Sequence, residues 1–98
     1  MENLIFTIQD DIDVINEYKN KINEQLVEKN IDYKLNTIDS IQIIDKIKQC
    51  NFTEEQIQLI YNLMSNSAYS AELRTAKTEG FYDEMITEEV DMIYEEMI

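Results

Sequence analysis

The sequence predicts an all-α fold, a small bundle of about four helices. The chain has no Pro and a single Gly, whereas sheet proteins need turn residues at regular intervals. Apolar residues make up 44% of the sequence and recur in steps of three and four, the spacing of one helix face. At 98 residues, the chain is expected to form one helical domain, residues 1–98, around one hydrophobic core.

The first helix is predicted from about Asp10 to Lys29. Asp10 is the expected N-cap, and Asp13 follows in the first turn, where acidic residues are favourable. Lys19 interrupts the apolar stripe of this helix. Residues 4–6 either extend the helix or form a short extended piece, so one short N-terminal strand or hairpin is the alternative. The stripe consists of Ile8, Ile12, Ile15, Ile22 and Leu26.

Residues 30–36 read as a connection, with a brief strand at 31–35 as an alternative. The next helix is expected to begin with Thr37 as N-cap and to end near Cys50, the only cysteine. Cys50 is interpreted as a small buried hydrophobe, because no basic residue is adjacent to activate its thiol. The stripe of this helix consists of Ile38, Ile41, Ile44 and Ile47, and Ile43 widens its buried face.

The strongest local signal is a capping box with a hydrophobic staple. Thr53 can cap a helix while Gln56 reaches back, and Phe52 can pack on Ile57. We therefore predict a helix that begins at Thr53. The small residues within 65–71 would allow close approach of another helix or a bend. The stripe is expected to run through Ile57, Ile60, Tyr61, Met64, Ala68 and Ala71.

A final helix is predicted from Phe81 or Tyr82 to the C-terminus. Gly80, the only glycine, stands where the C-cap of the preceding helix would fall. The apolar stripe of the final helix includes Ile86, Val90, Ile93 and Met97. Five acidic residues are expected on the opposite side, given about 3.6 residues per turn. These five are Asp83, Glu84, Glu88, Asp91 and Glu95.

The last twenty residues carry more than half of the net charge of −13, with eight acidic side chains and no Lys or Arg. Such a segment repels itself when folded, but it would be favourable against a basic surface. Side chains three or four positions apart on a helix have spacings similar to those of consecutive phosphates. A solvated face kept acidic for solubility is the alternative, although such faces normally mix both signs. We therefore predict partner binding by Glu79, Asp83, Glu84, Glu88, Glu89, Asp91, Glu95 and Glu96.

The composition argues against catalytic, cofactor and metal sites. The chain has no His and one Cys, which removes the usual general base, the common nucleophile pairs and a structural zinc site. One Gly cannot form a phosphate-binding loop. The carboxylate pairs at 10–11 and 88–89 are expected to be solvated, and residues 10–13 lack the glycine and distant Glu of a calcium loop. The protein is not expected to be an enzyme.

Direct binding to nucleic acid or to a membrane is not expected. The eight basic residues are scattered among acidic neighbours, so they form no basic stripe. No apolar run approaches the length of about eighteen residues that a membrane span needs, and the N-terminus does not resemble a secretory signal. A reducing cytoplasm is the expected compartment.

As a small, acidic chain free of His and Pro, with helices predicted throughout, the protein resembles the inhibitors that phages and mobile elements make against host defence nucleases. This class includes anti-CRISPR and DNA-mimic anti-restriction proteins. The resemblance implies direct binding to a basic nucleic-acid groove, such as that of a Cas or restriction nuclease, in the cytoplasm of a bacterial host. Some members of the class instead lock a conformation or force dimerisation.

Two other functions fit the same sequence. In the first, apolar side chains of the final helix form a homodimer or dock on a protein partner, because Met-rich surfaces adapt to such contacts. The residues concerned are Tyr82, Met85, Met92, Tyr94 and Met97. In the second, the protein is an antitoxin or immunity protein that neutralises a basic toxin.

Overall fold

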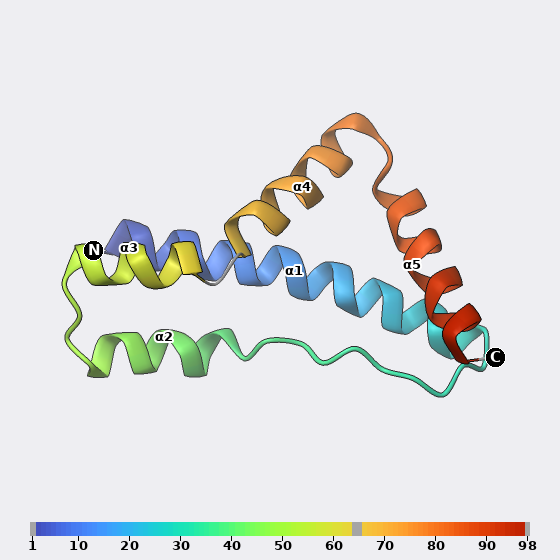
Figure 1. The fold of residues 1–98 in the computed structure, drawn as a ribbon, viewed down its shortest axis with the longest axis horizontal. Helices are drawn as coiled ribbons and strands as arrows, with labels where there is room; N and C mark the ends of the chain where they lie inside the picture. The colour runs from blue at the N-terminus through green and yellow to red at the C-terminus, as the bar shows by residue number, and fades with distance from the viewer. Residues whose placement is uncertain (1, 64–65, 98) are drawn as a thin grey trace.

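The computed structural model describes residues 2–63 and 66–97, with side chains for 4–60 and 69–97. These ranges form five helices and no strand, so the predicted all-α class is confirmed with one more helix than expected (Figure 1). The helices are α1 (Glu2–Glu28), α2 (Ser40–Gln49), α3 (Glu54–Leu63), α4 (Asn66–Glu79) and α5 (Tyr82–Met97).

The long helix α1 is the axis of the molecule, and each of the other described helices contacts it. The overall shape is elongated, with extents of 46 × 29 × 17 Å. After α1 the chain turns at Asn30, where φ is +58°, and residues 31–39 run back along α1 in an extended conformation. Helix α2 continues in the same direction, antiparallel to α1 (Figure 1). Helices α4 and α5 form an inverted V over the second half of α1. We call residues 30–39 the strap.

The core consists of two clusters along α1. The cluster near its N-terminus joins α1, α2 and α3 through Ile5, Ile8, Ile12, Ile44, Ile47 and Ile57. The second cluster joins α1, α4 and α5 through Ile15, Tyr18, Ile22, Leu26, Leu73, Ala76, Tyr82, Ile86, Val90 and Ile93. Ile38 in the strap packs against both clusters.

The predicted start of the first helix is wrong, because α1 begins at Glu2 rather than at Asp10. Ile5 is buried and continues the predicted stripe by one turn beyond Ile8, so residues 4–6 extend the helix and form no strand. Where Lys19 interrupts the predicted apolar stripe, the adjacent residue Tyr18 is buried in its place. Lys19 donates a hydrogen bond to the backbone oxygen of Asn36 at 3.2 Å.

The strap is fastened to α1 by two asparagine side chains. The amide of Asn23 donates to the oxygen of Leu35 at 3.0 Å and accepts from its nitrogen at 2.8 Å. Asn16 forms the same reciprocal pair with Ile38, with both distances 2.8 Å. These pairs satisfy strap backbone groups that a strand partner would otherwise satisfy. Residues 31–35 are therefore extended without being part of a sheet, and the predicted connection is confirmed.

The N-cap of α2 is Asp39 instead of the predicted Thr37. Asn16 holds both backbone groups of Ile38 in the strap, so the helix begins later, and the Asp39 carboxylate accepts from the nitrogen of Gln42 at 3.1 Å. Ile41 was predicted to be in the core but is 70% exposed, because α2 buries only the later residues of its stripe. Cys50 is also exposed, contrary to the prediction, since it is the C-cap.

The predicted capping box is confirmed at the start of α3. The Thr53 hydroxyl accepts from the nitrogen of Gln56 at 3.2 Å, and the Gln56 side chain accepts from the nitrogen of Thr53 at 2.9 Å. Phe52 packs against the cluster that contains Ile57, as expected of a staple. The structure describes this helix as far as Leu63 and α4 from Asn66, and residues 64–65 lie outside the described ranges.

The buried face of α4 differs from the stripe that the sequence predicts. Ala71 was predicted to continue the stripe of the preceding helix, but it is exposed, and α4 instead buries Ser70, Leu73 and Ala76. The predicted stripe position at Met64 lies outside the described residues, as do the side chains of Tyr61 and Ala68.

The turn from α4 to α5 follows the sequence prediction. Gly80 has a φ of +86°, a value that L side chains rarely adopt, and its nitrogen donates to the oxygen of Ala76 at 2.9 Å. The nitrogen of Phe81 donates to the same oxygen at 3.0 Å, and α5 begins at Tyr82. At the other end of α5, Met97 was predicted to be in the buried stripe but is exposed.

Candidate functional site

Helix α5 is fixed in position by one apolar face. Four of its side chains are buried against α1 and α4: Tyr82, Ile86, Val90 and Ile93. A side chain in such a face has few alternative positions, because packed interiors resist displacement. The opposite face of α5 is therefore presented to solvent in a defined orientation.

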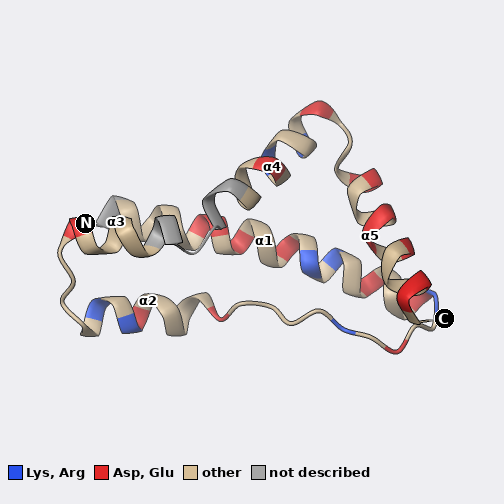
Figure 2. Ribbon diagram, in the orientation of Figure 1, with Lys and Arg blue, Asp and Glu red and all other residues tan. Residues whose placement is uncertain are grey.

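The face of α5 opposite the core carries four exposed carboxylates, which we call the acidic stripe: Glu84, Glu88, Asp91 and Glu95. Their steps of four and three residues place them within about 60° of arc, roughly opposite Ile86. Neighbours in such a row have Cβ atoms about 5–6 Å apart. Figure 2 shows that α5 bears acidic residues and no Lys or Arg.

The other four predicted partner-binding residues lie away from the acidic stripe. Glu79 is the last residue of α4, on the far side of the Gly80 turn. Asp83 was expected on the same face as the stripe, but it borders a depression with Lys21 and Lys77. Glu89 is half-buried, and Glu96 is exposed on a different side of α5. The structure therefore brings together four of the eight predicted residues.

One basic side chain reaches the acidic stripe from another part of the chain. The ammonium of Lys29, next to the end of α1, lies 3.5 Å from the carboxylate of Asp91. Both side chains are at least half exposed, so this pair contributes about 0–1 kcal/mol to stability. Although α5 itself has no basic residue, Lys29 thus partly neutralises its negative charge from more than sixty positions away in the sequence.

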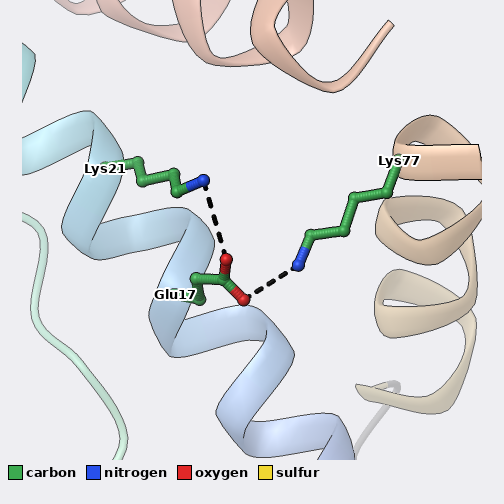
Figure 3. A network of polar contacts seen from close by, with 3 residues as sticks. All are labelled: Glu17, Lys21 and Lys77. Atoms are coloured by element: carbon green, nitrogen blue, oxygen red, sulfur yellow. Dashed lines mark hydrogen bonds and ion pairs between the residues drawn. The ribbon is translucent and has the colours of Figure 1, made fainter. Parts of the chain in front are cut away.

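Beside the start of α5, two lysines from different helices converge on one carboxylate (Figure 3). Lys77 of α4 donates to Glu17 of α1 at 2.8 Å, and Lys21 lies 3.6 Å from the other oxygen of Glu17. The hydrogen bond from Lys77 is the main reason that the pKa of Glu17 is lowered. Burial opposes this effect, while the positive charges of both lysines add to it.

The ring of Tyr82 completes this cluster. The ammonium groups of Lys21 and Lys77 each lie 5.1 Å from the ring centroid, within cation–π range. The Tyr82 hydroxyl is buried and has no hydrogen-bond partner among the described atoms. Burial, with help from the negative charges of Glu17 and Asp83, raises the pKa of Tyr82 to about 12. Tyr82 therefore stays neutral near pH 7 and serves as packing.

The same cluster borders a surface depression of about 400 Å³. Its lysines are matched by Glu17 and Asp83, so the depression offers no excess positive charge for an anion. Glu89 has a similar local role. Together with burial, the larger cause, its charge raises the pKa of Tyr18 and of Tyr69. These groups lie where α5 packs against α1 and α4.

Apolar side chains flank the acidic stripe. Met92 is 55% exposed and Tyr94 is 51% exposed, and each lies within one helical turn of stripe residues. The five residues predicted for an apolar interface therefore divide into two groups. Tyr82 is buried and Met85 packs partly against the core, whereas Met92, Tyr94 and Met97 face solvent.

The other acidic run in the sequence does not form a single site. Asp11 is buried, and its carboxylate accepts a hydrogen bond from Arg74 of α4 at 2.7 Å, while Asp10 and Asp13 are exposed. Among the residues that the structure describes, no group of three or more His, Cys, Asp or Glu could hold a metal ion. In the same part of the chain, no helix is long and apolar enough to cross a membrane.

Comparison of the chain with protein-family models, with curated proteins and with solved structures found no match. The acidic stripe and its surroundings are therefore the features from which a function is inferred.

Proposed function

We propose that this protein is an acidic inhibitor that occupies the basic nucleic-acid-binding groove of a host defence nuclease, in the bacterial cytoplasm. One observation carries the proposal. The acidic stripe is an exposed row of carboxylates on a helix whose opposite face is locked into the core. Such a helix can offer negative charge in place of phosphates while keeping the charges in fixed positions.

The spacing of the stripe supports this proposal. Cβ atoms about 5–6 Å apart approach the separation of consecutive phosphates on one strand. A groove that binds nucleic acid presents Lys and Arg to such a row of charges. Long-range attraction would speed association, because the net charge of −13 is opposite in sign to that of the groove.

The concentration of carboxylates on α5 also supports the proposal. The helix contains no Lys or Arg, and Lys29 approaches Asp91 from the end of α1 in a pair whose side chains are both exposed. Self-repulsion within the acidic stripe costs stability, which is reasonable if a partner later neutralises it.

The first experiment is capture of the partner from host cells followed by mass spectrometry. A Cas or restriction nuclease among the bound proteins would support the proposal, and a basic toxin would favour the antitoxin alternative. The binding surface is then tested with a stripe variant that neutralises four carboxylates. Its substitutions are Glu84→Gln, Glu88→Gln, Asp91→Asn and Glu95→Gln.

A control variant removes the same amount of charge from exposed acids outside α5. Its substitutions are Glu24→Gln, Asp32→Asn, Glu55→Gln and Glu72→Gln. We expect the stripe variant to lose at least about tenfold in affinity, a change of roughly 1.4 kcal/mol, and the control to lose much less. Equal losses would mean that net charge alone matters, and an unaffected stripe variant would contradict the proposal.

The second candidate function is a helical interaction module that binds through apolar contacts. The observation that favours it is the exposure of Met92, Tyr94 and Met97 on α5. In that case Met92→Ala and Tyr94→Ala would weaken binding, and salt would have little effect. The proposed inhibitor should instead bind less tightly as salt is raised, because exposed charges are screened over about 8–10 Å.

A further inference from the structure

The two core clusters lie on different halves of α1, and different helices pack on each (Figure 1). Helices α2 and α3 pack on the first half, through the cluster that contains Ile5, Ile8 and Ile12 of α1. Helices α4 and α5 pack on the second half, through the larger cluster. Loss of the contacts in one cluster therefore leaves most contacts of the other in place. We call α2 and α3, with the turn that joins them, the cover (residues 40–63).

The cover buries few apolar side chains of its own. Its described side chains include three that are buried, Ile44, Ile47 and Ile57, whereas α4 and α5 contribute six apolar side chains to the larger cluster. Ile41 and Leu59 of the cover are large and apolar, yet they are 70% and 58% exposed. Helices α2 and α3 have ten residues each, and isolated helices shorter than about 12–15 residues are marginal in water. The cover therefore depends on its contact with α1.

Polar contacts add to the apolar contacts that hold α4 and α5 on α1. The buried carboxylate of Asp11 accepts a hydrogen bond from Arg74 of α4 at 2.7 Å. The hydroxyl of Tyr18 donates to the backbone oxygen of Met85 in α5 at 3.3 Å. A buried carboxylate is costly to leave without its partner, so separation of α4 from α1 is opposed by more than the loss of apolar contacts.

The strap gives the cover a fixed boundary. Asn16 of α1 holds both backbone groups of Ile38 through hydrogen bonds of 2.8 Å. Helix α2 begins two residues later at Ser40, and Asp39 between them is its N-cap. Hinges are commonly a few residues at the end of an element that absorb a change in φ and ψ. A backbone rotation at Asp39 would move α2 and leave the hydrogen bonds of Asn16 intact.

We propose that the cover opens from the first half of α1 as one unit, while the strap, α4 and α5 stay packed on the second half. Opening exposes Ile5, Ile8 and Ile12, which are buried when the cover is closed. The acidic stripe keeps its position, because α5 belongs to the other cluster. An apolar surface is thus uncovered at one end of the molecule without disturbing the charges at the other. This inference goes beyond the proposed function and does not depend on it.

Native-state hydrogen exchange, followed residue by residue by NMR, tests the cover. Opening of the cover exposes only the amides of the unit that opens, whereas global unfolding exposes all of them. Rates are compared after division by the intrinsic rate of each amide. We expect the slowest amides of α2 and α3 to exchange at least about tenfold faster than the slowest amides of α5.

Two matched substitutions each remove one methylene group from a buried isoleucine. The contacts of Ile86 are present in both the closed and the open form, so Ile86→Val should speed exchange in α5 by about two- to tenfold and leave α2 and α3 unchanged. The contacts of Ile47 are lost on opening, so Ile47→Val should speed exchange in both α2 and α3 by about two- to tenfold. Ile41→Val is the control, because Ile41 is exposed on α2.

Equal acceleration of α2, α3 and α5 in Ile86→Val would mean that the molecule opens only as a whole, and it would overturn the proposal. Equal exchange of the three helices in the unmodified protein would have the same meaning. Acceleration of α2 without α3 in Ile47→Val would also overturn the proposal, because the two helices would then open separately.

Discussion

Thr53 contributes to stability through two short-range hydrogen bonds with Gln56, at an exposed helix start. We expect Thr53→Ala to lower the free energy of unfolding by about 0.5–2 kcal/mol, because Ala has no side-chain oxygen that can cap the helix. Urea denaturation followed by circular dichroism measures the change. Thr87→Ala is the control, since Thr87 is exposed within α5 and should tolerate Ala. Equal midpoints for Thr53→Ala and the unmodified protein would contradict the capping role.

Glu17 should make stability depend on pH. Its pKa is lowered from the ordinary 4.5, first by the hydrogen bond from Lys77. A carboxyl group whose pKa is lower when folded adds stability above its unfolded pKa, and this is lost as pH falls through the folded pKa. The stability difference between the unmodified protein and Glu17→Gln should therefore be larger at pH 7 than at pH 3.

Urea midpoints at the two pH values measure this difference. Glu24→Gln on the same helix is the control, because Glu24 is exposed. A difference between Glu17→Gln and the unmodified protein that stays constant, or grows toward pH 3, would contradict the linkage. The effect should be small, because the Glu17 side chain is nearly half exposed and its ion pairs are screened by solvent.

The structural role of a residue could be predicted where it depends on residues close to it along the sequence. Thr53 caps a nitrogen three positions away, and Gly80 ends a helix at its own position. Asn16 contacts a residue 22 positions away, and Arg74 one 63 positions away. No local pattern marks these long-range partners, because the partner is defined only by the fold. The sequence therefore could not reveal the hydrogen bonds of Asn16 and Asn23 to the strap, or the burial of Asp11.

The strap is the element whose conformation depends most on side chains. Asn16→Ala and Asn23→Ala each remove two hydrogen bonds to its backbone. We expect each substitution to cost about 1–3 kcal/mol, from two bonds of roughly 0.5–1.5 kcal/mol. Asn20→Ala is the control, since Asn20 is exposed on the same helix.

Hydrogen exchange gives a more local measurement of the strap. The amides of Leu35 and Ile38 donate to the two asparagines, so each should exchange faster in the variant that loses its partner. Exchange of the Leu35 amide should be nearly unchanged in Asn20→Ala. If both strap amides keep their protection in Asn16→Ala and Asn23→Ala, the apolar contacts of Ile31, Leu35 and Ile38 hold the strap by themselves.

The buried face of a helix could be predicted where other helices cover the whole of its apolar stripe. The stripe of α5 was identified correctly at Ile86, Val90 and Ile93, because α1 and α4 cover that side. The stripe of α2 was identified, but Ile41 at its N-terminal end is 70% exposed and only Ile44 and Ile47 of this helix are buried. Which stripe residues find a partner depends on the lengths and positions of the other helices, and a local pattern does not contain these.

At the scale of the whole molecule, charge repulsion should govern the response to salt. Adding salt screens repulsion among like charges, and it also weakens the few exposed ion pairs, each worth about 0–1 kcal/mol. With a net charge of −13, we expect the first effect to be larger. The thermal midpoint should rise between low and physiological ionic strength. The stripe variant should show a smaller rise, and a midpoint that falls with salt would contradict this account.

The sequence was sufficient to locate the acidic segment of the candidate site. It was not sufficient to say which of its carboxylates share one exposed surface. The sequence identified α5 as the acidic element, since its acidic residues lie in one short segment that contains no Lys or Arg. The helical pattern already placed Glu89 off that face, but only the structure separates the acidic stripe from Asp83, which lies near two lysines. The same is true of Lys29, which approaches Asp91 because α5 lies near the end of α1.

The most direct test of the central claim is a competition between this protein and nucleic acid for the captured target. If the acidic stripe takes the place of phosphates, the affinity of the protein for a target saturated with nucleic acid should fall at least about tenfold. Protein bound first should likewise exclude the nucleic acid. Equal affinity for the free and the loaded target, with a ternary complex detected, would contradict the claim that α5 acts as a nucleic acid mimic.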